Sequence, residues 1–298
     1  MAQPRRLLVL TTLVLCVLAI AISQQVRATG SLFELGSSPR LQGMGGVGLA
    51  LASGADATYY NPALLPSVDS WRVSSSYALH FGGVSYGTIG IAGPHLGLQF
   101  LLLDSGPIVG MDAETRYSTQ GLVGSLGTRI IPGVASTGVR LRLLRTTAPT
   151  RKLGWAVDPC LSLEFGSLRA GVIVEGVASR GFATRRGGNE PWEQSVSVGL
   201  GYTLDLMEDA RVAVAAELRD VFSTSREAAI GAEVQIDWLT ARVGVDGVGL
   251  AVGASFTARE MEFDYCCVFG RAGMGASSRM RLGIDLRSVF RKQQETQD

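Results

Sequence analysis

The sequence predicts an all-β protein, a 14-stranded antiparallel transmembrane β-barrel. Three observations predict this fold. From Trp71 onward, apolar side chains alternate with small or polar ones in segments of roughly ten residues that turn signals separate. Short connections alternate with longer ones along the chain, as in outer-membrane barrels. No amphipathic helix of any length competes with the strand pattern, which excludes α/β folds.

The N-terminus is typical of a secretory signal, with expected cleavage after Ala28. Arg5 and Arg6 precede an apolar run from Leu7 to Ile22. Removing residues 1–28 takes three of the 27 basic residues and no acid, which leaves 24 basic and 26 acidic residues and a net charge near −2. This balance argues against a nucleic-acid partner.

Fourteen segments carry the period-two pattern of a strand with two unlike faces. They span residues 71–79, 83–92, 96–103, 120–130, 136–147, 154–165, 166–177, 194–204, 210–221, 226–236, 239–247, 249–257, 261–270 and 278–290. In the segment 210–221, Val212, Val214 and Leu218 share one face, whereas Glu217 and Arg219 share the other. We expect the apolar faces to contact lipid and the charged faces to line a lumen.

Alternation alone also fits a soluble sandwich, so the connections and aromatic residues decide between the two. Every second connection is short, and the longer ones, 104–119, 178–193 and 270–277, fall on the other side. Trp71, Trp155, Trp192 and Trp238 lie at or just before predicted strand starts, where rings sit at a membrane interface. Both features favour the barrel in the bacterial outer membrane, with the lipid bilayer as its surroundings.

Gly43, Gly45 and Gly48 spell G-x-G-x-x-G, the pattern of a dinucleotide-binding turn. That pattern binds a cofactor only between a buried strand and a helix. Here the preceding "SLFELGSSPR" is interrupted by Gly36 and Pro39 and makes a poor buried strand. We therefore expect no cofactor, and we interpret the glycines as positions of close backbone packing.

Two blocks near the N-terminus, "GMGG" at residues 43–46 and "ATYYNPA" at residues 57–63, carry a family resemblance. The region 35–65 resembles the N-terminal segment of the FadL and PorV superfamily of outer-membrane proteins. Residues 250–286, with Asp264 and Tyr265 in the penultimate strand, resemble the last three strands of its PorV/PorQ-like branch.

The resemblance implies a 14-stranded barrel whose N-terminal segment folds into the lumen as a short hatch. The division is then a signal peptide at 1–28, a hatch at 29–70, the barrel at 71–290 and a tail at 291–298. The expected hatch residues are Gly43, Gly45, Gly46, Asn61, Pro62 and Ala63. Two features depart from the family: FadL-type fatty-acid transporters have much larger outer loops, so their ligand positions cannot be transferred, and Phe290 is not the terminal residue.

Catalytic chemistry finds few candidates in the sequence. His80 and His95 are the only histidines, and both are expected in hairpin turns at opposite ends of the barrel. No metal-ligand spacing is present, and we expect no enzyme activity. Cys160 and Cys266 are expected to point inward, either as free thiols or as a disulfide across the lumen.

Charges of both signs are expected to face the lumen, where they would form ion pairs that fill space and hold the hatch. A selective pore would show one dominant sign instead. The expected lumen charges are Arg140, Arg142, Arg169, Glu175, Glu217, Arg219, Glu233, Arg242, Asp246, Glu262, Asp264, Arg281, Asp285 and Arg287. The first three strands present almost no charge, so their wall either packs the hatch or borders an apolar pocket for a lipid-like ligand; Ser74 and Ser76 mark it.

Two functions follow from these expectations. The first is passive transport of hydrophobic small molecules past the hatch. The second is a PorV-type adaptor, which does not transport but serves protein secretion and binds a partner protein through its loops. Arg180, Arg185 and Arg186 are candidate contacts for such a partner, although a solvated or lipopolysaccharide-facing loop would look the same.

Overall fold

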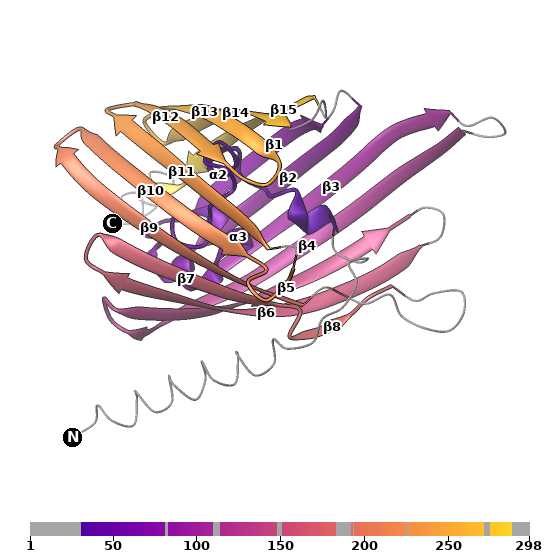
Figure 1. The fold of residues 1–298 in the computed structure, drawn as a ribbon, viewed down its shortest axis with the longest axis horizontal. Helices are drawn as coiled ribbons and strands as arrows, with labels where there is room; N and C mark the ends of the chain where they lie inside the picture. The colour runs from indigo at the N-terminus through magenta and orange to yellow at the C-terminus, as the bar shows by residue number, and fades with distance from the viewer. Residues whose placement is uncertain are drawn as a thin grey trace, which may run out of the picture.

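The computed structural model describes residues 31–80, 83–109, 114–147, 151–182, 192, 194–224, 226–270 and 275–287. The predicted signal peptide, the predicted tail, Arg185 and Arg186 lie outside these ranges. Within them the chain is almost entirely β-structure, closed into a barrel around a short helical N-terminal segment (Figure 1).

The strands follow one another around the barrel, each antiparallel to its neighbours. In chain order they are β1 (Arg72–His80), β2 (Val84–Gly93), β3 (Leu96–Val109), β4 (Glu114–Ile131), β5 (Ala135–Thr146), β6 (Lys152–Phe165), β7 (Leu168–Glu175), β8 (Ala178–Arg180), β9 (Ser195–Met207), β10 (Ala210–Arg219), β11 (Glu227–Ile236), β12 (Leu239–Val245), β13 (Gly249–Ala258), β14 (Met261–Gly270) and β15 (Ala276–Asp285). The ring closes because β1 pairs with β15, with Val73 opposite Ile284 and Tyr77 opposite Met280.

The barrel has the predicted 14 strands, because β7 and β8 share one position in it. β6 pairs with β7 over residues 160–165 and with β8 over residues 155–157. Gly176, at φ +69°, breaks the chain between them. The continuous strand predicted over 166–177 is therefore interrupted, because a positive φ ends regular pairing there.

The prediction of a long loop at 104–119 was wrong. β3 continues to Val109 and β4 begins at Glu114, so most of the expected loop is paired strand. Gly106 and Pro107 suggest a loop in the sequence, but they lie in a bulge between Asp104 and Pro107. The Asp104 carboxylate stabilises the bulge by accepting from the Gly106 amide at 2.8 Å and from Arg116 Nε at 3.0 Å. The last strand also ends earlier than expected, at Asp285.

The outer surface of the barrel is apolar. Leu98, Leu200 and Ile230 on three different strands are each at least 50% exposed, and their strand neighbours point inward. Such a band is solvated by lipid in a transmembrane barrel. None of the helices in the described ranges has the length and hydrophobicity needed to cross a bilayer.

All the short turns lie at one end of the barrel. They join β2 to β3, β4 to β5, β6 to β7, β9 to β10, β11 to β12 and β13 to β14. Because outer-membrane barrels keep short turns on the periplasmic side, we call this the periplasmic end and the opposite one the outer end. Trp238 lies at the periplasmic end, half exposed, with its ring edge-on to Phe256 at 5.4 Å between centroids.

Residues 31–70, which we call the luminal segment, lie inside the barrel (Figure 1). They form η1 (Ser31–Glu34), α2 (Pro39–Gln42), α3 (Ala55–Tyr60) and η2 (Pro62–Ser67). Ser38 caps α2 by accepting from the Leu41 amide, and Pro39 occupies the first helical turn, where its missing N–H costs nothing. Asn61 starts η2 by accepting from the Ala63 amide at 3.1 Å.

Glycines on the wall and in the luminal segment let the two backbones meet. A Cβ on Gly244 of β12 would lie 2.0 Å from the Met44 carbonyl carbon, and one on Gly171 of β7 would lie 2.1 Å from the Leu49 oxygen. In the segment itself, Gly45 has φ +73° and would place a Cβ 2.8 Å from the Val245 oxygen. Close packing therefore accounts for the glycine pattern that resembles a dinucleotide motif.

Candidate functional site

The alternation of each strand places the predicted lumen charges on the inner face, where most of them pair. The exception is Arg287, which is exposed beyond β15 and contacts Asp69 at the periplasmic end. Arg169 pairs with Glu164 at the β6–β7 turn, away from the luminal segment. The other charges form three groups, each of which contacts the luminal segment.

The first group lies on β5, β6 and β7. Asp158 is fully buried between Arg140 and Arg142, at 2.8 Å and 2.7 Å from their Nε atoms. Glu175 contacts both arginines from β7. Arg140 also donates to the backbone oxygen of Tyr59 in α3. Asp158 was missed by the sequence analysis, although it shares the inward face of its strand with Cys160, which was identified.

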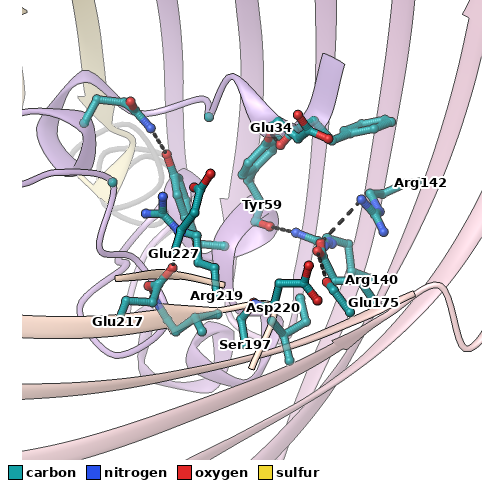
Figure 2. A pocket seen from close by; sticks show the side chains of 18 of the residues that line it. Glu34, Tyr59, Arg140, Arg142, Glu175, Ser197, Glu217, Arg219, Asp220 and Glu227 are labelled. Carbon is teal, nitrogen blue, oxygen red and sulfur yellow. Dashed lines mark hydrogen bonds and ion pairs between the residues drawn. The ribbon is translucent and has the colours of Figure 1, made fainter. Parts of the chain in front are cut away.

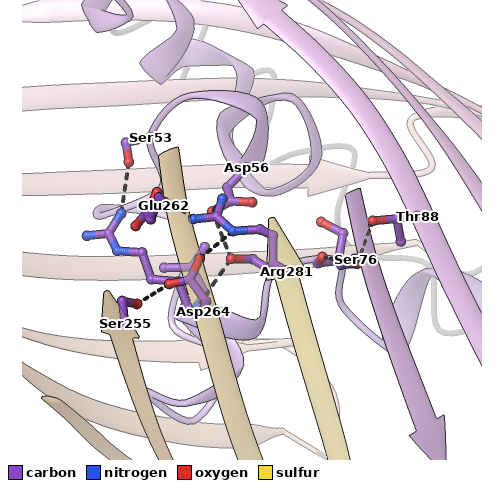
Figure 3. Close-up of polar contacts among 12 residues, drawn as sticks. Ser53, Asp56, Ser76, Thr88, Ser255, Glu262, Asp264 and Arg281 are labelled. Atoms are coloured by element: carbon purple, nitrogen blue, oxygen red, sulfur yellow. Dashed lines mark hydrogen bonds and ion pairs between the residues drawn. The ribbon is translucent and has the colours of Figure 1, made fainter. Parts of the chain in front are cut away.

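The second group lies on β11 to β15 and binds two charges of the luminal segment (Figure 3). Arg281 contacts Asp264 at 2.6 Å, Glu262 at 2.9 Å and Asp56 of α3 at 3.1 Å. Ser38 also donates to Asp56 at 2.7 Å. The cluster therefore fixes the start of α3 to the last two strands.

Arg40 of α2 extends the second group across the lumen. It donates through two nitrogens to Glu233, at 3.0 Å and 2.9 Å, and Glu233 also accepts from Arg242. Burial disfavours the charge on Arg40, but Glu233 outweighs this cost and the pKa of Arg40 is raised. Neither Arg40 nor Asp56 was identified from the sequence, because the luminal segment has no strand alternation to assign its inward face.

The third group explains where the glycine-rich turn binds. The amides of Gly48 and Leu49 donate to one carboxylate oxygen of Glu217, at 2.8 Å and 3.0 Å. Arg219 donates to the Gly45 oxygen at 3.2 Å and pairs with Glu217 at 3.0 Å. The amides that would hold a phosphate in a nucleotide site are thus occupied by a wall carboxylate.

Other expected hatch residues hold the segment's own shape. Asn61 donates to the Leu49 oxygen at 2.6 Å, which ties the glycine-rich turn to the start of η2. Pro62 and Ala63 pack against Gly127 and Gly138, where a Cβ would lie within 2.6 Å of the Pro62 and Ala63 backbone. Gly43 contacts Gly253 and Cys266, and Gly46 lies beside the Arg219 guanidinium.

The uncharged wall of β1, β2 and β3 packs against α3. Tyr86 and Leu101 are fully buried in one core cluster with Tyr59 and Leu65. Ser76 donates to the Ser37 oxygen at 3.2 Å, and Gly97 lies directly against Thr58. Of the two interpretations of this wall, packing of the luminal segment is the one that these contacts support.

A cavity of about 200 Å³, which we call the outer cavity, lies on the other side of the luminal segment. It is bounded by the outer ends of β7, β9, β10 and β11 and by the luminal segment. Figure 2 shows Arg140, Arg142 and Glu175 on one side and Glu217, Arg219 and Glu227 on the other, with Asp220 between them. Its apolar lining includes Phe33, Leu49, Tyr59, Tyr60, Ile173 and Trp192.

Trp192 does not lie at the membrane interface, as its position in the sequence predicted. It is 3% exposed and points inward. The Arg142 guanidinium carbon lies 5.3 Å from the Trp192 ring centroid and 5.4 Å from that of Phe33. The loop before β9 therefore folds back over the lumen, and a cation–π contact holds its tryptophan on η1.

The cysteines and histidines carry no evident catalytic arrangement. Cys160 and Cys266 are buried and free. His95, in the β2–β3 turn, contacts the Gly127 oxygen through Nδ1, and His80 ends β1 rather than lying in a turn. In the part of the chain that the structure describes, no group of three potential ligands is placed to hold a metal ion.

No family model and no curated protein matches the sequence. The fold does match solved structures. CymD, a monoaromatic hydrocarbon channel, is 14% identical with a TM-score of 0.57, over 84% of this chain and 96% of CymD. The toluene transporter TbuX of Ralstonia pickettii is 13% identical with a TM-score of 0.53, over 84% of this chain and 97% of TbuX. The toluene transporter TodX of Pseudomonas putida is 10% identical with a TM-score of 0.54, over 83% and 96%.

At these identities the likeness concerns the fold. The neighbours are FadL-like barrels, which agrees with the broader part of the sequence resemblance, and they do not bear on the PorV/PorQ-like branch. Together with the apolar exterior and the closed strand order, they establish the architecture. The chain is a 14-stranded bacterial outer-membrane β-barrel.

Proposed function

We propose that this barrel admits hydrophobic small molecules by passive diffusion, and that the luminal segment is its hatch. The observation that carries the proposal is the outer cavity, which lies between that segment and the barrel wall. A molecule arriving from outside would first occupy this cavity and would then be stopped by the segment beneath it.

The size of the outer cavity suits a small ligand. Its volume is about 200 Å³. A dry protein cavity of roughly 150 Å³ is enough to hold benzene. The structural neighbours carry names that fit this size, a monoaromatic hydrocarbon channel and two toluene transporters.

A second cavity, of about 220 Å³, lies at the periplasmic end, between Ser53–Ala55 and strands β1, β13, β14 and β15. The salt bridges from Arg40 to Glu233 and from Asp56 to Arg281 lie between the two cavities. Buried charge pairs of this kind cost several kcal/mol to break. The arrangement therefore represents a closed state, and passage requires the luminal segment to shift.

The adaptor function remains the second candidate because some outer connections are short. Only residues 246–248 join β12 to β13, and residues 81–83 join β1 to β2. Short loops leave little room for collecting a ligand and fit a flat docking surface. Arg180, one of the candidate contacts, ends β8 at the outer end.

Uptake measurements test the proposal and separate it from the adaptor. Cells with a lipopolysaccharide outer membrane, producing the full chain, should take up labelled toluene faster than cells without it. Deletion of residues 29–65 should make uptake faster still and less selective for size. Because the deletion could prevent assembly, folded barrel is first quantified by its resistance to unfolding in detergent on gels. Equal uptake with and without folded protein would refute transport and favour the adaptor.

A further inference from the structure

We infer that the outer cavity selects an amphiphilic cation, a molecule with an apolar body about the size of one aromatic ring and an amine or quaternary ammonium group. The inference rests on the proposed function, because it names the ligand class of the same cavity. It goes beyond the hydrocarbons in the names of the structural neighbours, since a hydrocarbon has no use for a charged lining.

The first argument is the balance of charge. Among the described residues, five carboxylates and three guanidinium groups line the outer cavity. The carboxylates belong to Glu34, Glu175, Glu217, Asp220 and Glu227, and the guanidinium groups to Arg140, Arg142 and Arg219. Three positive and five negative charges give −2, and the buried Asp158 behind them brings the total to −3. A lining of this sign attracts cations and repels anions.

The second argument is that all three arginines are already engaged. Arg140 and Arg142 each contact both Asp158 and Glu175. Arg219 contacts Glu217 and, at 4.0 Å, Asp246. An anionic ligand would have to displace a carboxylate that is held in place by the barrel. A cationic ligand would add to the carboxylates without breaking an existing pair.

The third argument is the apolar part of the cavity. The rings of Phe33, Tyr59, Tyr60 and Trp192 and the side chains of Leu49 and Ile173 line it. Aromatic rings add cation–π attraction to their hydrophobic contact area. Since the described residues offer no cluster suited to a metal ion, an organic cation fits this mixed lining better than an inorganic one.

The test uses three water-soluble probes that share one benzene ring: benzyltrimethylammonium, benzyl alcohol and benzenesulfonate. Their affinities for the full chain in a non-ionic maltoside detergent are measured by calorimetry. We expect the cation to bind at least about tenfold more tightly than the anion, with the alcohol between them.

A double variant, Asp220→Asn with Glu227→Gln, removes two of the lining charges. Asn is conservative at position 220, because it tolerates the φ of +53° found there. The ratio of cation to anion affinity should fall about tenfold. Asp205→Asn is the matched control, since it removes a carboxylate that pairs with Arg211 at the periplasmic end, far from the cavity.

The outcomes separate this inference from the proposed function. Equal or tighter binding of benzenesulfonate, or an unchanged ratio in the double variant, would overturn cation selection even if toluene uptake by cells depended on the protein. A cation preference that the double variant lowers and the control keeps would support the inference, even if toluene uptake proved independent of the protein.

Discussion

The two sides of the lumen hold the same luminal segment by different means. On the side of β1 to β4, α3 and η2 lie against small and apolar side chains, with Thr58 directly on Gly97 and Tyr59 packed near Tyr86. On the side of β10 to β15, α2 and the glycine-rich turn are held by ion pairs, through Glu217, Glu233 and Arg281. Shape fixes one half of the segment and charge fixes the other.

This difference has a functional meaning. Close packing against a wall cannot be released in part, whereas ion pairs can exchange partners as water or a ligand enters. We therefore expect the charged side to be where the segment detaches, and the outer cavity indeed lies next to Glu217 and Arg219. The predictions below test the two sides separately.

The largest effect is expected on the charged side, from Arg281→Met. Asp56, Glu262 and Asp264 would lose their shared cation. Leaving buried charge uncompensated typically costs about 3–5 kcal/mol, and the free energy of unfolding in urea, followed by tryptophan fluorescence in lipid vesicles, should fall by that amount. A loss below about 1 kcal/mol would show that this group does not stabilise the barrel.

A smaller effect is expected on the packed side, from Gly97→Ala. The new methyl group would lie 1.9 Å from the Thr58 hydroxyl oxygen. Overpacking of this kind costs about 1–3 kcal/mol, measured in the same unfolding experiment. Gly124→Ala on the neighbouring strand is the control, because nothing lies within 4 Å of its new Cβ. Equal stabilities of the two variants would contradict the tight packing of α3 on this wall.

Arg40→Met should affect permeability more than stability. Glu233 keeps Arg242 as a partner, so we expect a loss of only about 1.5 kcal/mol, that of a charged hydrogen bond. Removing the guanidinium should nevertheless connect the two cavities, and the ion conductance of single barrels in planar bilayers should rise several-fold. Unchanged conductance would mean that Arg40 is not part of the barrier.

The smallest effect is expected from Arg211→Met, which breaks an exposed pair with Asp205 outside the lumen. Exposed pairs contribute at most about 1 kcal/mol, and we expect less than 0.5 kcal/mol here. The same unfolding measurement makes this variant the reference for Arg281→Met. A loss as large as that of Arg281→Met would show that position in the lumen does not matter.

The sequence was sufficient for the barrel because its information is local. Alternation at residues such as Val212, Val214 and Glu217 fixes which face contacts lipid, and turn residues fix where strands end. It failed where a turn residue lies inside a strand, as at Gly106 and Pro107, because a bulge and a loop have the same composition.

The candidate site was less predictable, because it depends on contacts between distant parts of the chain. Arg140, Glu217 and Arg281 could be placed in the lumen by alternation, but their partners Asp56 and Arg40 are in a segment without period. Trp192 was misplaced for a related reason. Its position before a strand is equally compatible with an interfacial ring and with one that folds inward onto Arg142.

The central claim is that the luminal segment must move for a molecule to pass, and a single cysteine tests it. A Cβ at Gly43 would lie 3.4 Å from the Cβ of the native Cys266, close to the separation of roughly 3.5–4.5 Å in disulfides. Gly43→Cys should therefore let oxidation tie the segment to β14, and Gly43→Cys with Cys266→Ser is the control that cannot form the bond. Toluene uptake by cells should stop on oxidation and return on reduction in the first variant alone. Undiminished uptake through fully cross-linked barrels would contradict the claim.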